Sequence, residues 1–255
     1  IQEPPEDDAL IRYILGSAYL ATKEYENAIT QLKAAISINS TDAQVYNNLG
    51  SAYLAVKKYS ESLECFEKAI ELDPESAISY HNAGSLLQIK GQIAEAINYY
   101  KKALDLEPHN YVSQISLGLA CYRARRFDEA IEIFKHILYY HPDKTSVINN
   151  LALSYAGAGR YDEALEQFKK LLELKPESEA VKYKIARVLT DMGKFEQAYE
   201  LYKELLSVKK DSPEIYYHYA LLNVEMDNTD EAVDALNKVI SLSPNEARAH
   251  KDLGV

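Results

Sequence analysis

Three asparagines recur in the sequence at multiples of one spacing. Asn82 follows Asn48 by 34 residues, and Asn150 follows Asn82 by 68, which is twice 34. A side-chain amide offers a hydrogen-bond donor and an acceptor together. It can therefore pair with the N–H and C=O of one extended peptide residue, whatever the side chain of that residue. This chemistry is recognition of a polypeptide backbone; the alternative is that the amides bond only to neighbouring helices or water.

The other residues give little support for a catalytic site or a metal site. His136 and His141 are five residues apart, which does not place both on one helical face, and no cysteine or carboxylate completes a zinc pattern. The sequence contains no glycine-rich phosphate loop and no G-x-S-x-G nucleophile elbow. Carboxylates such as Asp128 and Glu129 suit the first turn of a helix. We therefore predict a protein that is not an enzyme and holds no metal or cofactor.

The net charge and hydropathy of the chain limit the kinds of partner that we expect. The 255 residues carry a formal net charge of −11, which disfavours binding to a phosphate backbone. No run approaches the roughly 18 apolar residues of a membrane span, and the first residues do not resemble a signal peptide. We expect a soluble segment with a protein partner, no nucleic acid and no membrane contact. The two cysteines, Cys65 and Cys121, read as buried small hydrophobes and leave the compartment open, with the cytoplasm favoured over the periplasm.

A 34-residue repeat runs through the chain. Residues 47–74 are echoed in residues 81–108 and again in residues 149–176, and a repeat at a fixed period indicates an array of helical hairpins. Seven repeats are predicted, at 9–42, 43–76, 77–110, 111–144, 145–178, 179–212 and 213–246. We expect residues 1–8 to be an N-terminal linker and residues 247–255 to be the truncated start of an eighth repeat, in a parent protein that continues.

Each repeat combines small and bulky residues at fixed positions. Position 8 is always small, as in Gly50, and position 24 is always bulky, as in Phe66. A bulky side chain set against a small residue lets two helices approach closely. The pattern therefore predicts two helices in each repeat; in the second repeat they are residues 43–56 and 59–72. Glycines 91, 159 and 193 stand in the turn between them, and Ser212 and Pro213 signal a helix start.

These positions resemble the tetratricopeptide repeat family. In the second repeat the family pattern is met by Tyr46, Leu49, Gly50, Tyr53, Phe66, Ala69 and Pro74. The resemblance covers residues 9–254. It implies an all-α fold, an α-α superhelix, that is, a right-handed solenoid of antiparallel helix pairs. It also implies a protein–protein interaction scaffold.

In this family the first helices of the hairpins line a concave groove, built from positions 2, 5, 6, 9, 12 and 13 of each repeat. Asn48, Asn82 and Asn150 fall at position 6 and are similar to part of the asparagine ladder of the O-linked N-acetylglucosamine transferases, which holds an extended peptide. The ladder is interrupted at Ser116. The predicted peptide-binding residues are Asn47, Asn48, Ser51, His81, Asn82, Ser85, Ser116, Asn149, Asn150, Tyr183, Lys184, Arg187 and Tyr217.

The groove positions are nearly uncharged. Lys184 and Arg187, one helical turn apart, form its only cationic pair, and they either bind an acidic group or form ion pairs with Glu214 or Glu225. The cationic partners of the family's carboxylate clamp are missing. The charged groove residues are Arg123, Lys184, Arg187, Asp191, Glu214 and Glu225.

Three functions remain open. The first is a non-catalytic scaffold that binds an extended peptide or partner segment in the groove. The second is a structural assembly module, a homo-oligomer that associates through its terminal repeats. The third is the substrate-recruiting arm of a larger enzyme such as a glycosyltransferase.

Overall fold

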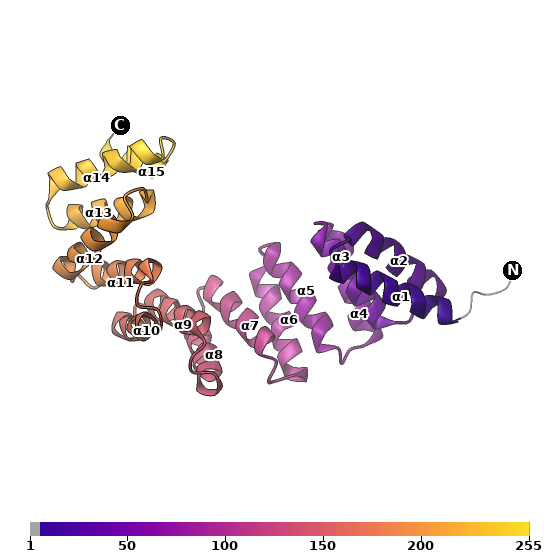
Figure 1. Ribbon diagram of the computed structural model, residues 1–255. Coiled ribbons are helices and arrows are strands. Elements are labelled where there is room, and N and C mark those ends of the chain that lie inside the picture. Colours follow the sequence, from indigo (N-terminus) through magenta and orange to yellow (C-terminus); the bar gives the residue numbers. More distant parts are fainter. Residues whose placement is uncertain (1–5, 255) are drawn as a thin grey trace. The chain divides into compact units, whose positions relative to one another are not determined.

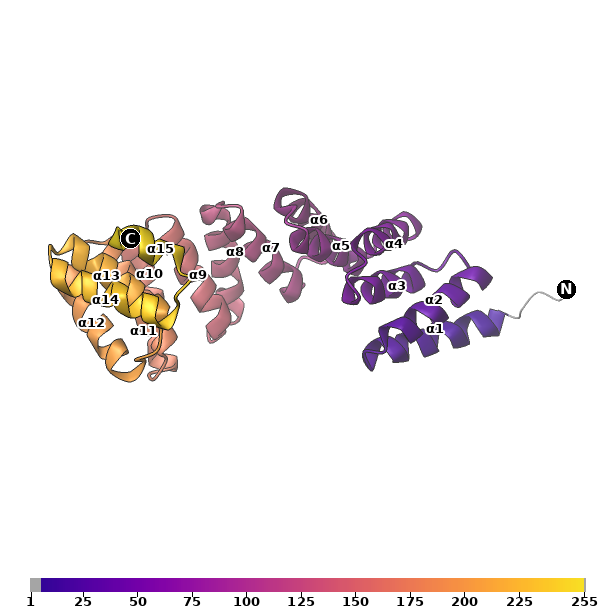
Figure 2. The same cartoon turned by 90° about the horizontal axis from the view of Figure 1, so that it is seen from above.

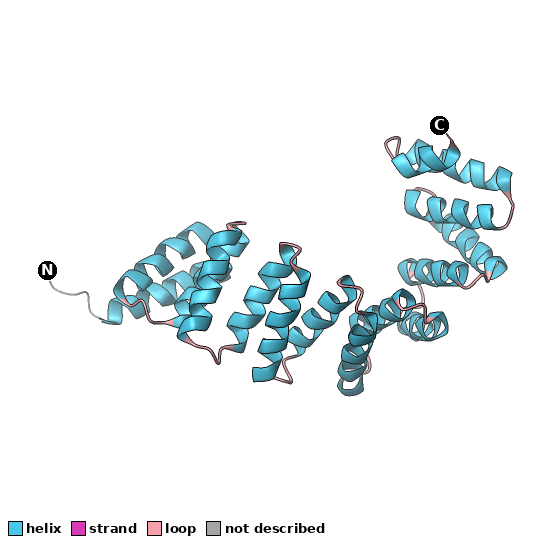
Figure 3. Cartoon of the chain, turned by 180° about the vertical axis from the view of Figure 1, so that it is seen from behind, coloured by secondary structure: helices cyan, strands magenta, loops and turns pink. Residues whose placement is uncertain are grey.

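The computed structural model describes residues 6–254, and every regular element in that range is an α-helix joined to the next by a short loop (Figures 1 and 3). The all-α fold class is therefore confirmed. The helices are α1 (Glu6–Ala21), α2 (Tyr25–Ile38), α3 (Ala43–Ala55), α4 (Tyr59–Leu72), α5 (Ala77–Ile89), α6 (Ile93–Leu106), α7 (Tyr111–Arg123), α8 (Phe127–Tyr140), α9 (Thr145–Gly157), α10 (Tyr161–Leu174), α11 (Glu179–Asp191), α12 (Phe195–Val208), α13 (Pro213–Glu225), α14 (Thr229–Leu242) and α15 (Ala247–Leu253).

The chain forms two compact units, residues 1–133 and residues 134–255, with the division inside α8. We call them the N-terminal and C-terminal units. In the N-terminal unit α1 packs on α2, α3 on α4 and α5 on α6 (Figure 2). The second helix of each hairpin also contacts the first helix of the following repeat, and the last of these contacts joins α6 to α7. In the C-terminal unit the hairpins are α9/α10, α11/α12 and α13/α14, and α15 packs on α14. We call the odd-numbered helices the A helices.

The A helices after α1 begin at Ala43, Ala77, Tyr111, Thr145, Glu179, Pro213 and Ala247, which are also the residues that begin the predicted repeats. Local capping explains several of these starts. The side chain of Asp42 accepts a hydrogen bond from the backbone N–H of Gln44 over 2.9 Å. Ser212 caps α13, and Pro213 occupies the first turn, as its sequence predicts.

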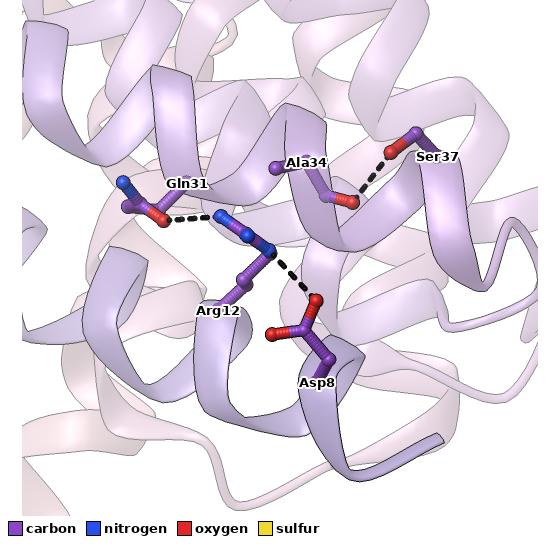
Figure 4. A network of polar contacts seen from close by, with 5 residues as sticks. All are labelled: Asp8, Arg12, Gln31, Ala34 and Ser37. Atoms are coloured by element: carbon purple, nitrogen blue, oxygen red, sulfur yellow. Dashed lines mark hydrogen bonds and ion pairs between the residues drawn. The ribbon is translucent and has the colours of Figure 1, made fainter. Parts of the chain in front are cut away.

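Helix α1 begins earlier than expected. The sequence predicts a linker over residues 1–8, but residues 6–8 form the first turn of α1; residues 1–5 of that linker lie outside the described residues. One physical reason is visible in Figure 4, where Asp8 accepts from Arg12, one turn later, over 3.3 Å. Arg12 also donates to Gln31 of α2 over 3.2 Å, which ties this turn to the first hairpin.

The first three hairpins close because a glycine and a bulky residue meet. A Cβ atom on Gly50 would lie 2.6 Å from the ring of Phe66, and one on Gly16 would lie 2.7 Å from Leu32. Phe66 and Leu32 are fully buried. The bulky side chain therefore fills the space that the missing side chain leaves, as the repeat pattern predicts.

Every turn from an A helix to the second helix of its hairpin contains one residue with positive φ, that is, with left-handed backbone conformation. This residue is a glycine in three hairpins, at Gly91, Gly159 and Gly193, and a residue other than glycine in the other four. Left-handed backbone is strained for residues that carry a Cβ atom. The hairpin packing therefore imposes the turn where the sequence offers no glycine signal. These four residues are Lys23, Lys57, Arg125 and Asp227.

Both cysteines are buried and free, as predicted, and burial raises the pKa of the Cys65 thiol to about 11. Among residues 6–254 there is no helix with both the length and the apolar character needed to span a bilayer. Within the same range no cluster of three or more His, Cys, Asp or Glu side chains is arranged to hold a metal ion.

Candidate functional site

The predicted binding residues lie on the A helices, at the fifth, sixth and ninth positions of the repeats. We call the surface that these positions form the A-helix surface, and each unit carries its own part of it. Twelve of the thirteen predicted residues are half-buried and Arg187 is exposed. Half-buried polar side chains are held by their neighbours while part of each stays open to a partner.

In the N-terminal unit, Asn48 and Asn82 both reach back to the preceding A helix. The Asn48 amide on α3 donates to the hydroxyl of Ser17 on α1 over 2.9 Å. The Asn82 amide on α5 donates to the side-chain carbonyl of Asn47 on α3 over 3.0 Å. Each amide therefore binds a neighbouring helix. Within the described residues, however, its carbonyl oxygen and its second N–H have no partner.

Two further predicted residues bond within the same surface. The His81 ring on α5 shares a 2.9 Å hydrogen bond with the hydroxyl of Ser113 on α7, and burial lowers the pKa of His81. The Ser51 hydroxyl donates to the backbone carbonyl of Asn47 in its own helix over 3.0 Å. Together with the two amide bonds, the contact from His81 to Ser113 joins four successive repeats, from α1 to α7, by uncharged polar contacts.

Ser85 and Ser116 are linked to the core by one buried tyrosine. The hydroxyl of Tyr100 donates to Gln88 over 3.2 Å. Burial raises the pKa of Tyr100, and hydrogen bonds with Ser85 and Ser116 partly oppose this rise. The two serines therefore anchor a core side chain as well as lining the surface.

In the C-terminal unit a lysine makes the contact that Asn82 makes in the N-terminal unit. Lys184 on α11 donates to the side-chain carbonyl of Asn149 on α9 over 2.5 Å, again between residues 35 apart. Asn149 in turn donates to the carbonyl of Asn150 over 3.3 Å. The inter-repeat bond is the same, but its donor is charged.

Aromatic rings dominate the next part of this surface. Tyr183, Tyr217 and His218 form a row in which the ring of His218 lies 5.7 Å from Tyr183 and 5.6 Å from Tyr217. Tyr183 donates to Glu214 over 3.1 Å. Burial, with a contribution from the Arg187 charge, lowers the pKa of His218 to about 4, so its ring is neutral near pH 7.

A cavity of about 330 Å³ adjoins this row. Its size is at the lower end of small ligand pockets. One wall is the ring of Tyr217, with the Arg248 guanidinium over it at 4.9 Å. Its lining residues are Pro213, Glu214, Tyr217, His218, Val239, Glu246 and Arg248.

Sequence reasoning missed the residues that hold the predicted ones. Ser17 and Ser113 are the partners of Asn48 and His81, and His218 joins the tyrosines. His218 occupies the same repeat position as Asn48, and Ser17 the same position as Ser51, so the register was the signal for both. No comparable signal marked Ser113, which stands at the third position of its repeat, because pairing between repeats depends on how the A helices are oriented.

The paired helices, the small-and-bulky contacts and the polar A-helix surface define a tandem tetratricopeptide repeat array. Residues 189–253 match the tetratricopeptide repeat family directly. Residues 6–215 match the family described as the cilia and flagella-associated protein 70 C-terminal domain, and the chain belongs to that family. Comparison with curated proteins found no significant match.

Solved structures agree with this fold. A tetratricopeptide repeat protein from Parabacteroides merdae is 19% identical with a TM-score of 0.71, over 97% of this chain and 98% of that one. The C-terminal part of a repeat-containing protein from Cytophaga hutchinsonii is 20% identical with a TM-score of 0.74, over 94% and 99%. A chain of the APC/C hetero-tetramer Cut9–Hcn1 is 16% identical with a TM-score of 0.62, over 98% and 52%. This fold is typical of protein-interaction scaffolds.

Proposed function

We propose that the protein is a non-catalytic scaffold whose A-helix surface binds a partner polypeptide in an extended conformation. One observation carries the proposal. Asn48 and Asn82 each use one N–H to bond to the preceding repeat, and among residues 6–254 each keeps a carbonyl oxygen and a second N–H unused. An amide held in this way is oriented before the partner arrives, which lowers the entropic cost of binding.

The spacing of these amides suits an extended chain. Packed helices lie about 8–10 Å apart, and an extended peptide rises about 3.3 Å per residue. Successive A helices would therefore meet every third residue of the partner. Each amide can accept from a peptide N–H and donate to a peptide C=O, so this binding would be tolerant of the partner's side chains.

Replacing Asn48, Asn82 and Asn150 together by alanine is expected to weaken partner binding on the order of 100-fold, because three amides are lost and each backbone contact contributes about 1 kcal/mol. Helical content should not change. The measurement is affinity purification with the wild-type chain as bait, followed by calorimetric Kd values for the recovered partner segments.

The matched control replaces Asn27, Asn98 and Asn237 by alanine. These asparagines are exposed and lie on the second helices of their hairpins. The control should bind like the wild type. If the Asn48/Asn82/Asn150 variant also binds every recovered partner with wild-type affinity, the proposal is wrong.

A second candidate, self-association through the terminal repeats, is favoured by one face of α1. In α3 the stacking residues Val45, Leu49 and Ala52 are at most 4% exposed. The residues at the same repeat positions in α1 are uncovered among the described residues: Ile11 is 60% exposed, Leu15 is 39% exposed and Ala18 is exposed. An apolar face of this kind suits a helix of a second copy.

Self-association predicts that the average mass in light scattering rises with protein concentration, and that Ile11→Glu abolishes the rise because it places a charge in the contact. Ile78→Glu is the control, since Ile78 is similarly exposed at 56% but lies on α5 and not on the terminal helix. A wild-type chain that stays monomeric at every concentration would exclude this candidate.

A further inference from the structure

The cavity of about 330 Å³ in the C-terminal unit has a charge pattern of its own. It lies between the start of α13, the end of α14 and the start of α15, at the C-terminal end of the chain in Figure 1. We call it the terminal cavity. The fully buried Val239 lines it from α14, and most of its other lining side chains are polar or aromatic. Its volume suits a single side chain or a small ligand.

The positive charge that lines the terminal cavity is already neutralised. The guanidinium group of Arg248 forms an ion pair with Glu246 over 2.8 Å, and hydrogen bonding to Glu246 raises the pKa of Arg248. The ring of His218 adds no charge near neutral pH, because burial lowers its pKa to about 4. The remaining charge on the lining is therefore the carboxylate of Glu214.

Glu214 has no counter-charge within the described residues. One of its oxygens accepts a hydrogen bond from the hydroxyl of Tyr183 over 3.1 Å, while the other has no partner there, and the side chain forms no ion pair. A neutral hydroxyl orients a carboxylate but does not cancel its charge. Asp252, whose carboxylate accepts from Tyr217 over 2.8 Å, adds a second negative charge next to the cavity. A cation is therefore favoured here.

The aromatic wall of the terminal cavity already contacts a cation. The guanidinium group of Arg248 lies 4.9 Å from the centre of the Tyr217 ring, within the distance at which the face of an aromatic ring attracts a positive charge. The side chain of Arg248 is 66% exposed, so packing does not fix it, and it can yield the ring to another cation. The cavity thus combines a ring face with an unpaired carboxylate.

The carboxylate of Glu214 is not a requirement of the repeat. In the first repeat a cavity of about 100 Å³ occupies the corresponding place, and there Leu10 stands at the position of Glu214. Asp42, at the position of Glu246, is used to cap α3, whereas the Glu246 side chain makes no capping bond to α15. Glu214 is the one acidic residue at position 2 of the seven repeats, since the others are Leu10, Gln44, Ile78, Val112, Ser146 and Ala180.

We propose that the terminal cavity binds the cationic side chain of an arginine or a lysine of the partner polypeptide, with Glu214 as its counter-charge and Tyr217 as the ring that it contacts. This inference rests on the proposed function, because it assigns one side chain of the polypeptide that the A-helix surface binds. The net charge of −11 would also attract a basic segment before contact. The amides tolerate any partner side chain, whereas this cavity selects a basic one.

The test uses three blocked amino acids: N-acetyl-arginine amide, N-acetyl-lysine amide and N-acetyl-norleucine amide. Norleucine has the four-carbon chain of lysine without its ammonium group. Binding to the wild-type chain is followed by NMR through the ring signals of Tyr217 and His218, near neutral pH and at low salt. We expect the arginine or the lysine compound to bind about fivefold more tightly than the norleucine compound, because it adds an ion pair and a cation–π contact. Whichever gains affinity identifies the basic residue.

Glu214→Gln should abolish this fivefold gain, because it removes the charge while its amide oxygen can still accept from Tyr183. Glu225→Gln is the matched control, since it removes an exposed carboxylate that lies on the same helix but does not line the cavity, and it should keep the gain. Arg248→Gln should act in the opposite direction and increase the gain, because it leaves Glu246 without its cation.

The inference is overturned if the three compounds bind equally well, if none of them binds, or if Glu214→Gln keeps the gain. The variant in which Asn48, Asn82 and Asn150 are alanine should bind the arginine or lysine compound as the wild type does, because a single blocked amino acid does not use those amides. Failure of the cavity would leave backbone recognition standing, and failure of the asparagine test would leave cation binding measurable, so the two proposals fail separately.

Discussion

Phe66→Ala is expected to lower the free energy of unfolding of the N-terminal unit by about 3–5 kcal/mol, the range found when a buried phenylalanine is truncated. Phe66 is fully buried, and its ring faces Gly50 across the α3/α4 hairpin. Because glycine has no side chain, Gly50 cannot fill the vacated space.

The cavity would weaken two interfaces at once. Phe66 also belongs to a core cluster with Ala83 and Leu86 of α5, so its removal loosens both its own hairpin and the contact with the next one. Stability in a repeat array is close to a sum of repeat and nearest-neighbour contributions. The loss should therefore concentrate in α3, α4 and α5 and spread little further.

Denaturant unfolding gives the overall loss, and amide hydrogen exchange locates it. Exchange should accelerate in α3, α4 and α5 and stay near wild type in α13 and α14. Tyr139→Ala truncates an aromatic residue that is 81% exposed and should change stability by less than about 0.5 kcal/mol. A Phe66→Ala variant as stable as this control would contradict the packing described for the hairpin.

The same pair shows how far sequence predicts this fold. Gly50 and Phe66 recur as a small and a bulky residue in every repeat, and their spacing alone predicts that they meet. The turns were less predictable. Lys57 takes the left-handed conformation that Gly91 takes one repeat later, because the paired helices impose it against the local preference of a lysine.

The sequence predicts which helices carry the candidate binding residues, but not which contacts those residues make. The repeat register placed Asn48 and Asn82 on the A helices, where both are half-buried. It did not predict that one bonds to Ser17 and the other to Asn47. Such contacts join residues 31 or 35 apart, and which one forms depends on the orientation of adjacent helices, which a residue count does not contain.

Lys184 and Arg187 illustrate the same limit for charge. Sequence left open whether they pair with Glu214 or Glu225, since all four positions belong to neighbouring A helices. In the structure Glu214 instead accepts from Tyr183. The tyrosine hydroxyl takes the place that an ion pair would have taken, and within the described residues Lys184 and Arg187 form no ion pair with Glu214 or Glu225.

His218 is expected to make the C-terminal unit sensitive to mild acid. The cause of its low pKa is first burial between Tyr183 and Tyr217, then the positive charges of Arg187 and Arg248, with Glu214 acting in the opposite direction. The pKa is about 4 in the folded state and 6.5 for an ordinary histidine. Between these two values the unfolded chain binds more protons than the folded one, so stability falls as pH falls.

Above pH 6.5 His218 should therefore carry no such penalty, and between pH 6.5 and pH 4 the penalty should grow to about 1–2 kcal/mol. This figure is smaller than the full shift implies, because the ring is only half-buried and solvent screens it. His218→Gln removes the titrating group. The free energy of unfolding of both proteins is measured with denaturant at about pH 7 and again at about pH 4.5. On going to the lower pH, the wild type should lose about 1–2 kcal/mol more than the variant.

His136→Gln serves as the control, because His136 is exposed and its replacement should leave stability nearly unchanged at both pH values. Comparing the variants isolates His218 from the carboxylates that also become protonated in acid, since those are common to all three proteins. If wild type and His218→Gln lose stability in parallel as the pH falls, the ring of His218 is not held neutral by its surroundings.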